Sequence, residues 1–383
     1  MSGPSAQPPL RLGMVGGGSG AFIGAVHRIA ARLDGEYTLV AGALSSTPEK
    51  SRASAEALGI PRAYDDYLAM AKAEARRKDG IEAVAIVTPN HRHAGPAIEF
   101  LKRGIHVICD KPLTATMAEA KKLAAAAAKA DALFVLTHNY TGYPMIRQAR
   151  AMVAAGEIGR IRLVQVEYVQ DWLTEAAEKS GSKQAEWRTD PERSGAGGAT
   201  GDIGTHAYNL ACFVSGLTPE ALAADLQTFV PGRALDDNAH VLLRFAGGAR
   251  GMLWASQVAP GNENGLRLRV YGDKGGLEWA QEDPNYLWFT PFGEPRRRIT
   301  RNGAGAGPEA GRVSRIPPGH PEGYLEGFAN IYAEAARAIR AHQKGEAVPE
   351  DVLFPTLADG LAGMRFVEAC VQSSRRNAGW VTL

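Results

Sequence analysis

Short apolar runs alternate with helix-compatible segments over the first third of the chain. Strands of a parallel sheet covered on both faces are apolar throughout, whereas helices space their apolar residues more widely. The pattern therefore predicts one doubly wound α/β domain over residues 10–137. Strands are expected at residues 10–15, 37–44, 83–87, 106–109 and 133–137, and helices at residues 25–33, 48–58, 94–103 and 117–130.

The rest of the chain alternates apolar with polar residues. Period-two alternation between glycine-rich turns predicts a mainly antiparallel sheet with one face open to solvent or to association. Its strands are expected at residues 161–170, 239–245, 250–256, 266–271 and 286–290. Helices at 202–216, 324–344 and 357–374 are expected to cover the other face, and residues 302–321 to form a long exposed loop. We thus expect an α+β domain over residues 138–383, preceded by a disordered tail of residues 1–9.

Composition agrees with two domains and excludes several classes of protein. The chain has 383 residues, more than twice the ~150 of a typical domain. A net charge of +2 gives no field for nucleic-acid or membrane-surface binding, and no apolar stretch approaches the ~18 residues of a membrane span. Cys109, Cys212 and Cys370 have no Cys-x-x-Cys spacing, which argues against disulfides and structural zinc. We therefore expect a cytoplasmic protein with neither nucleic-acid nor membrane partners.

A glycine-rich turn follows the first expected strand. Gly16, Gly18 and Gly20 allow a tight bend and close approach of the backbone, while the next helix presents its first amide hydrogens to a pyrophosphate. Ala21 occupies the usual place of the third glycine, and Gly24 suits that helix-packing role if the loop is three residues longer. The turn predicts a dinucleotide cofactor.

The second expected strand lacks the acidic residue that often binds the adenosine ribose. Ser45 and Ser46 stand there instead, followed by Lys50 and Arg52. Serine hydroxyls suit a ribose hydroxyl or a 2′-phosphate, and the basic residues would neutralise the phosphate. These residues leave NAD and NADP both open, and a plain turn that caps the next helix is an equal alternative for Ser46 and Thr47.

Polar clusters follow two further strands, at the edge where open α/β sheets bind ligands. One contains Thr88, Asn90 and His93, and the other contains Asp110 and Lys111. Pro112 biases Lys111 to an extended backbone, which would aim its ammonium group into the cleft. The alternative is a solvated surface lysine.

A glycine-rich segment in the second half leads to Asp202 and His206. At positions i and i+4 of a helix these side chains share a face, where a carboxylate fixes the tautomer of an imidazole and raises its basicity. This arrangement predicts a general base with its orienting acid. The alternative is a helix cap beside an incidental histidine. The spacing suggests no third ligand, so no metal is expected.

Taken together, these motifs resemble the glucose–fructose oxidoreductase, inositol dehydrogenase and rhizopine catabolism (Gfo/Idh/MocA) family. The resemblance covers most of the chain, and the motifs occur in the family's order. They are Gly24-Ala25-Val26-His27, Thr88-Pro89-Asn90-His91-Arg92-His93, Asp110-Lys111-Pro112, Gly156-Glu157-Ile158-Gly159, Trp187-Arg188 and Gly201-Asp202-Ile203-Gly204-Thr205-His206-Ala207.

The resemblance implies a Rossmann domain, a second domain whose open sheet makes dimers or tetramers, and nicotinamide-dependent oxidation of a sugar or cyclitol hydroxyl. It implies that His206 is the base, that Lys111 orients the hydroxyl and stabilises the alkoxide, and that Asp202 orients the base or the substrate. Arg188 and His320 would supply further contacts to ring hydroxyls. Besides the glycines, the cofactor-binding residues would be Phe22, Ile23, Ser45, Ser46, Lys50, Thr88, Asn90, His93, Asp110, Lys111 and Asn139.

Three features depart from the usual family pattern: Asp110 replaces a glutamate, the glycine loop is longer, and the acid after the second strand is missing. In the longer loop Phe22 and Ile23 would cover the pyrophosphate. This form resembles a branch with scyllo-inositol, L-glucose and levoglucosan dehydrogenases, which implies NAD as the cofactor. We expect an NAD-dependent dehydrogenase of a cyclitol or sugar; the alternatives are a glycoside hydrolase that uses transient oxidation and a non-catalytic NAD-binding sensor.

Overall fold

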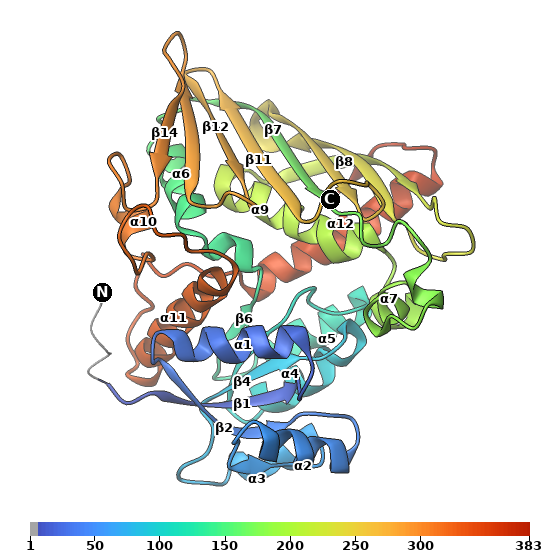
Figure 1. Cartoon of the computed structure of the whole chain (residues 1–383), viewed down its shortest axis with the longest axis vertical. Coiled ribbons are helices and arrows are strands. Elements are labelled where there is room, and N and C mark those ends of the chain that lie inside the picture. Colours follow the sequence, from blue (N-terminus) through green and yellow to red (C-terminus); the bar gives the residue numbers. More distant parts are fainter. Residues whose placement is uncertain (1–6) are drawn as a thin grey trace. The chain divides into compact units, whose positions relative to one another are not determined.

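The chain passes more than once between two units in the computed structural model, which describes residues 7–383 (Figure 1). Unit 1 runs to Gly142 and resumes over Tyr324–Leu361, and unit 2 comprises Tyr143–Gly323 and Ala362–Leu383. Of the predicted tail, residues 1–6 lie outside the described residues, and residues 7–9 are exposed.

The sheet of unit 1 has six parallel strands in the order β3-β2-β1-β4-β5-β6. This order confirms the predicted Rossmann-type domain, and it reverses direction between β1 and β4, where such sheets bind ligands. Every residue of β4 and β5 is buried, as continuous apolar runs predict. The strands are Leu10–Gly16, Tyr37–Ala43, Arg62–Ala63, Ala83–Val87, His106–Cys109 and Phe134–Leu136, numbered β1 to β6.

Local sequence sets several helix ends in unit 1. The Asp66 side chain accepts a hydrogen bond from the Ala69 amide before α3, and Thr116 accepts one from the Glu119 amide before α5. Proline at the start of α2 needs no amide hydrogen there. Helices α1 to α5 are Phe22–Leu33, Pro48–Ala57, Tyr67–Glu74, Ala94–Leu101 and Met117–Ala127, with short 3-10 helices at Asn90–Arg92 and Asn139–Gly142.

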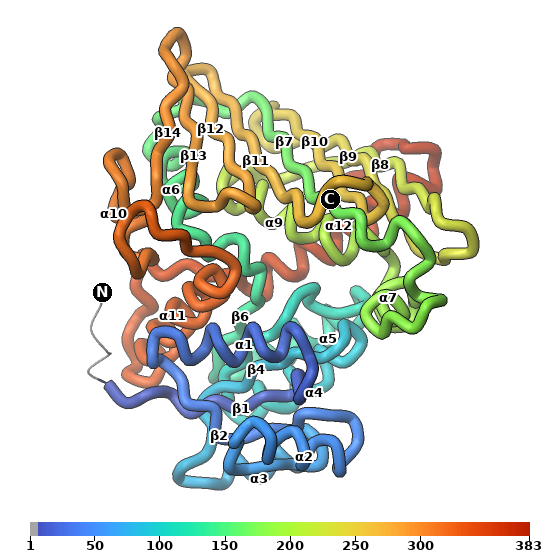
Figure 2. The backbone as a smooth tube through the Cα atoms, in the orientation of Figure 1, coloured from blue at the N-terminus to red at the C-terminus, as the bar shows by residue number. Residues whose placement is uncertain are grey.

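Helix α11 (Tyr324–Gln343) belongs to unit 1, which corrects two predictions: that residues 138–383 form one domain, and that this helix covers the second sheet. Figure 2 shows α11 running beside α1. Its apolar face, including Phe328, Ile331 and Ala335, joins one buried cluster with Leu12 and Val26. Burial of that face by the Rossmann core determines where the helix packs.

The sheet of unit 2 has nine strands in the order β14-β13-β12-β11-β7-β10-β9-β8-β15. Neighbours are antiparallel except β7 and β10, which confirms the predicted mainly antiparallel sheet. Strands β9 and β10 alternate buried with exposed residues. The strands are Ile161–Val169, Pro219–Gln227, Asn238–Phe245, Arg250–Ser256, Gly265–Gly272, Gly275–Ala280, Tyr286–Pro291, Arg297–Thr300 and Val381–Thr382, numbered β7 to β15.

Helix α9 packs on the buried face of this sheet, and Tyr208 of α9 stacks on Phe366 of α12. The segment predicted to be a long exposed loop, residues 302–321, contains the short helix α10 with the buried residue Ala310, and Val313 beyond the helix is also buried. The helices are α6 (Pro144–Ala154), α7 (Lys183–Arg188), α8 (Pro191–Ser194), α9 (Thr205–Ser215), α10 (Pro308–Gly311) and α12 (Leu357–Arg375), with 3-10 helices at Ala177–Lys179 and Ala246–Gly248 and a π-helix at Thr200–Gly204.

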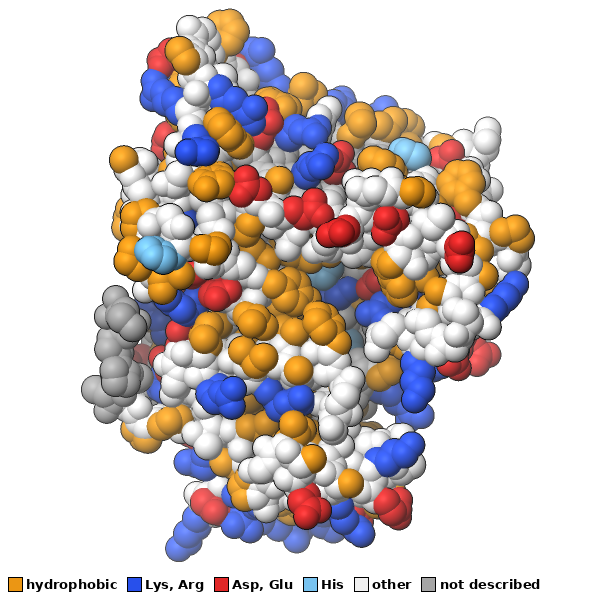
Figure 3. Space-filling model, viewed as in Figure 1, with side chains coloured by type: hydrophobic (Ala, Val, Ile, Leu, Met, Phe, Trp, Pro, Cys, Tyr) orange, Lys and Arg blue, Asp and Glu red, His pale blue; other side chains and the backbone are white. Residues whose placement is uncertain are grey.

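On the face shown in Figure 3, basic and acidic side chains intermingle, as the near-zero net charge leads us to expect. None of the helices in the described part of the chain is both long and apolar enough to span a membrane.

Candidate active site

The glycine turn between β1 and α1 depends on its glycines in two ways. Gly16, Gly17 and Gly20 have φ values of 77°, 66° and 81°, a region that side chains disfavour. A Cβ on Gly24 would lie 2.3 Å from the Gly17 carbonyl oxygen, so α1 packs directly against the turn. This confirms that Gly24, not Ala21, has the helix-packing role of the third glycine.

The start of α1 is suited to an anion. The residue before it, Ala21, provides no side-chain cap, and the first turn carries no acidic side chain. The first amides of the helix and its dipole therefore favour a negative group there. Gly16 pairs with Val87, and a Cβ on Gly16 would lie 2.8 Å from the Thr88 side chain, so the turn and the cluster after β4 are adjacent. Phe22 is 69% exposed.

The serines after β2 lie beside the same turn. A Cβ on Gly18 would lie 2.8 Å from the Leu44 carbonyl oxygen, immediately before Ser45. Ser45 accepts a long hydrogen bond from the Thr47 amide (3.5 Å), while Ser46 and Lys50 are exposed. Thr47 makes no side-chain cap for α2. Arg52 donates two hydrogen bonds to the Asp65 carboxylate, from Nε to Oδ1 at 2.9 Å and from Nη2 to Oδ2 at 2.7 Å.

His93 joins two of the ligand-edge segments through their backbone. Its ring is fully buried, with Nδ1 2.8 Å from the Pro112 carbonyl oxygen and Nε2 2.8 Å from the Thr88 carbonyl oxygen. Each ring nitrogen thus lies within hydrogen-bond distance of a backbone carbonyl oxygen. The ring thereby ties Thr88 to the segment that carries Lys111, and its predicted part in cofactor binding would act through these backbone contacts.

The ends of β5 and β6 bring Asp110, Lys111, His138 and Asn139 to the same edge of the unit 1 sheet. Thr137 Oγ1 donates to Asp110 Oδ1 at 3.0 Å, and the Lys111 amide donates to the same oxygen at 2.9 Å. Burial and the positive charge of Lys111 lower the pKa of His138 to about 3, so its imidazole is neutral. Among the described residues, the buried Nδ2 of Asn139 has no hydrogen-bond partner.

These observations fit a dinucleotide. A buried amide donor without an acceptor costs free energy, which a bound ligand with an acceptor group recovers. The residues that would hold the cofactor are Gly16, Gly18 and Gly20 with the start of α1, Ser45 and Ser46, Thr88 and Asn90, and Asn139. Asn90 is 4% exposed and begins the 3-10 helix after β4.

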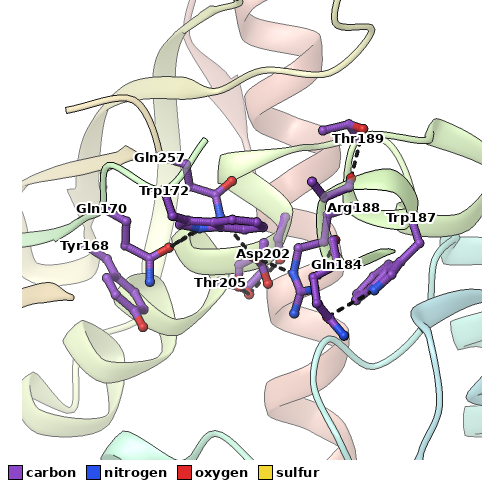
Figure 4. Close-up of polar contacts among 12 residues, drawn as sticks. Tyr168, Gln170, Trp172, Gln184, Trp187, Arg188, Thr189, Asp202, Thr205 and Gln257 are labelled. Carbon is purple, nitrogen blue, oxygen red and sulfur yellow. Dashed lines mark hydrogen bonds and ion pairs between the residues drawn. The ribbon is translucent and has the colours of Figure 1, made fainter. Parts of the chain in front are cut away.

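In unit 2, Asp202 is the centre of a polar cluster (Figure 4). Its Oδ2 accepts hydrogen bonds from Arg188 Nε at 3.1 Å and from Gln257 Nε2 at 3.0 Å. The guanidinium of Arg188 lies 4.2 Å from the Trp187 ring centre and 5.9 Å from that of Trp172, which restricts its orientation. Because Arg188 neutralises Asp202, the cluster presents hydrogen-bonding groups with little net charge.

Asp202 lies in the π-helix, and His206 lies about one turn further along, on α9. The exposed fraction of His206 is 7%. The Tyr168 ring packs against the His206 ring with ring centres 6.0 Å apart. The glycine-rich start of this segment is held by Asp236, whose carboxylate accepts hydrogen bonds from the Gly198 amide (2.7 Å) and from the Thr200 amide and hydroxyl (2.8 and 2.7 Å). Burial raises the pKa of Asp236, although these hydrogen bonds act to lower it.

The structure thus groups the predicted residues by unit. Unit 1 collects the glycine turn, Thr88, Asp110, Lys111 and Asn139 at one sheet edge, and unit 2 collects Arg188 and Asp202 with His206 one turn away. His320 is exposed in a separate loop. No cluster of three or more metal-binding side chains occurs among residues 7–383.

Sequence reasoning missed Gln257, Gln170 and Asp236. Gln170 and Gln257 directly follow β7 and β10, whose parallel pairing places both glutamines at one edge, with Gln257 Nε2 3.5 Å from Gln170 Oε1. A signal was available in the polar residues at the ends of two apolar-alternating strands. The alternation does not reveal that these two strands pair in parallel, because the sequence predicts a mainly antiparallel sheet.

Comparison with known proteins agrees with this fold. Residues 10–138 match the oxidoreductase family model with an NAD-binding Rossmann fold, and residues 146–278 match the GFO/IDH/MocA C-terminal domain. A solved oxidoreductase from Sinorhizobium meliloti is 65% identical, with a TM-score of 0.88 over 98% of this chain and 100% of the other.

An inositol dehydrogenase homologue from Azotobacter vinelandii, solved with NAD⁺, is 38% identical, with a TM-score of 0.94 over 99% of this chain and 98% of the other. Levoglucosan dehydrogenase of Pseudarthrobacter phenanthrenivorans is 28% identical over 97% of each chain. Fold and matches define an oxidoreductase with an NAD-binding Rossmann domain. The chain belongs to the Gfo/Idh/MocA family, which confirms the family predicted from its motifs.

Proposed function

We propose that this oxidoreductase is an NAD-dependent dehydrogenase that oxidises a secondary hydroxyl of a cyclitol or sugar, such as an inositol, L-glucose or a related pyranose, to the ketone or lactone. The observation that carries the proposal is the cluster around Asp202, where Arg188 cancels the carboxylate charge and Gln257 adds amide groups. A site with paired charges and several donors and acceptors favours a neutral, polyhydroxylated ligand over an anion.

The relatives support this substrate class. The Azotobacter vinelandii homologue has also been solved with NADH and myo-inositol, at 37% identity and a TM-score of 0.91. A levoglucosan dehydrogenase solved with NADH and levoglucosan is 26% identical, with a TM-score of 0.82. Cyclitols and anhydrosugars share a ring of neighbouring secondary hydroxyls, which is the chemistry that we propose for this chain.

The proposed roles follow from the chemistry of each side chain. NAD, when bound, accepts the hydride. His206 takes the hydroxyl proton on a ring nitrogen, Asp202 orients the base or the substrate, and the ammonium of Lys111 donates a hydrogen bond to the oxygen as negative charge develops on it. Arg188 and His320 would contact other hydroxyls of the substrate.

Lys111→Met provides the test of this function. We expect the wild-type protein to reduce NAD with at least one of the inositol isomers, L-glucose, D-glucose or levoglucosan, followed by the absorbance of NADH. Loss of the ammonium should lower kcat by about 10²-fold or more, since it acts on charge that develops only in the transition state. Parallel assays with NADP and with glycosides separate the alternatives. Absence of turnover with every polyol, or glycoside hydrolysis with non-exchanging NAD, would contradict the proposal.

We also propose that the chain forms dimers or tetramers through the open face of the unit 2 sheet. Leu163, Leu242 and Met252 point outward from three strands and are 47%, 50% and 52% exposed, and Leu242 is the register partner of Met252. Exposed apolar residues grouped on one sheet face are typical of an interface.

Leu242→Glu should therefore lower the molar mass measured by light scattering, because each subunit would bring a buried charge to the interface. Phe292→Glu is the control, since Phe292 is 85% exposed beyond the end of β13. A monomeric wild-type protein would contradict the assignment. We also propose a cytoplasmic location, because the three cysteines are free thiols, which a reducing compartment preserves.

A further inference from the structure

Three polar side chains link the apolar core of unit 1 to the residue that precedes Lys111. They are Tyr332, His27 and Asp110. His27 of α1 and Tyr332 of α11 are 0% and 1% exposed, and His27 Nδ1 lies 2.8 Å from the Tyr332 hydroxyl. The other ring nitrogen, Nε2, lies 3.9 Å from Oδ1 of Asp110. These three residues come from separate parts of the sequence, and the packing of α1 against α11 brings the first two together.

The surroundings of His27 give its ring few other polar options. The Phe328 ring packs on it with ring centres 5.1 Å apart, and the Tyr332 ring meets it edge-on at 5.8 Å. Among the described residues, Nε2 has no hydrogen-bond partner. Leaving a polar nitrogen unbonded in a core costs free energy, so its retention calls for a compensating interaction, and Asp110 is the charged group within ion-pair distance.

The tyrosine determines which ring nitrogen carries the hydrogen. If the Tyr332 hydroxyl donates to Nδ1, the hydrogen of a neutral ring resides on Nε2 and faces the Asp110 carboxylate. In the other neutral tautomer the Nε2 lone pair would face the carboxylate, which is repulsive. Burial and the charge of Asp110 raise the pKa of Tyr332 well above its usual value, so the phenol keeps its proton and remains a donor.

We propose that His27 and Tyr332 are positioning residues, which hold the Asp110 carboxylate in place beside Lys111. Asp110 Oδ1 also accepts hydrogen bonds from Thr137 Oγ1 and from the Lys111 amide, so this carboxylate fixes the backbone from which the Lys111 side chain starts. The consequence for turnover rests on the proposed dehydrogenase function, whereas the state of the carboxylate does not.

Electrostatics agree with this geometry. Burial raises the pKa of Asp110, but the imidazole of His27, the ammonium of Lys111 and the imidazole of His93 outweigh burial and bring it to about 2. Asp110 is therefore a carboxylate at every ordinary working pH. The titratable groups that face it from the surrounding elements are His27, Tyr332, His93, Cys109, Lys111 and His138.

Removing the imidazole should reverse this balance. In His27→Leu, burial is opposed by fewer interactions, so the pKa of Asp110 should rise toward or above the ordinary value of about 4. Asp110 would then gain a proton as the pH falls through that range. Turnover should fall reversibly on the acid side and recover at higher pH, where the carboxylate forms again.

Four variants of the 383-residue chain, His27→Leu and the three described next, separate positioning from packing. Tyr332→Phe removes only the hydroxyl that bonds the ring, and His27→Gln restores a donor near the position of Nε2. Tyr37→Phe is the matched control, because its hydroxyl lies in the same core and donates to the Tyr332 carbonyl oxygen at 3.1 Å, away from the imidazole. Unfolding by urea shows whether each variant is folded.

The first measurement is the ¹³C NMR titration of aspartate carboxyl groups, with the Asp110 signal assigned from Asp110→Asn. We expect no titration of Asp110 above about pH 4 in the wild type and in Tyr37→Phe. In His27→Leu we expect a midpoint at least about one pH unit higher than in the wild type, with a smaller shift in Tyr332→Phe and partial rescue in His27→Gln. The second measurement is the pH profile of kcat, whose acid limb should move in each variant by the same amount as the NMR midpoint.

Titration of Asp110 at the same pH in all variants would overturn the proposal, even if their stabilities differed. A shifted midpoint in a protein that oxidises no polyol would support the positioning network and contradict the dehydrogenase function. A shifted midpoint with an unchanged kcat profile would overturn the part that links the carboxylate to Lys111. If His27→Leu does not fold, Tyr332→Phe against Tyr37→Phe decides the same question.

Discussion

His206→Asn should lower kcat by about 10³-fold while changing the Kd for NADH by less than about twofold. A positioned general base contributes roughly 10²- to 10⁴-fold, and asparagine keeps the polar shape of the side chain but does not accept a proton near neutral pH. The residue lies on α9 in unit 2, whereas the residues that fit the dinucleotide belong to unit 1, so cofactor binding should survive.

The test combines steady-state kinetics with titration of NADH fluorescence. His342→Asn is the matched control, because this histidine is partly exposed in unit 1 and pairs with the solvent-exposed Asp131. Its kcat should stay within about twofold of the wild type. Near-normal kcat in His206→Asn would show that another group is the base. Weakened NADH binding by the same variant would show that its lower kcat does not report proton transfer alone.

The sequence sufficed for the parts of the site that are local. The glycine turn, the segment from Thr88 to His93 and the Asp110-Lys111 pair each directly follow a buried strand, and parallel strands end at a common edge. Their alignment therefore follows from the alternation of strands and helices alone. The same holds for Asp202 and His206, which are separated by about one helical turn.

Contacts between distant segments were beyond reach. An amphipathic pattern shows that one face of a helix is buried, but it does not show which surface covers that face. The sequence therefore predicts α11 on the sheet of unit 2, whereas Phe328 and Ile331 of this helix complete the core of unit 1. The buried chain from Tyr332 through His27 to Asp110 depends on that packing. For the same reason, His27 appeared in the sequence only as the end of a motif.

The polar partners of Asp202 were hidden for a related reason. Gln257 directly follows β10 and Arg188 ends α7, 55 and 14 residues away from Asp202. Regular alternation shows where strands lie but leaves their order and direction open. The parallel pairing of β7 with β10 inside an otherwise antiparallel sheet is set by long-range packing.

Gly24→Ala should weaken NAD binding by about tenfold or more, equivalent to ~1.4 kcal/mol of binding free energy, and destabilise unit 1 by about 1–3 kcal/mol. The added Cβ would lie 2.3 Å from the Gly17 carbonyl oxygen and 2.5 Å from its Cα, and these are backbone atoms that no side-chain rotation relieves. The helix or the turn must move, and the first amides of α1 would then lose their alignment with a bound pyrophosphate.

Gly363→Ala makes the same substitution inside helix α12, where the nearest atom to a Cβ is the Thr205 methyl group at 4.0 Å. It should leave stability unchanged or raise it by up to ~1 kcal/mol, because alanine favours a helix over glycine. Urea unfolding and calorimetric titration with NAD measure both quantities. If the two variants had the same free energy of unfolding and the same affinity for NAD, the turn would accommodate a side chain at little cost. The close contact between Gly17 and Gly24 would then not determine the shape of the cofactor site.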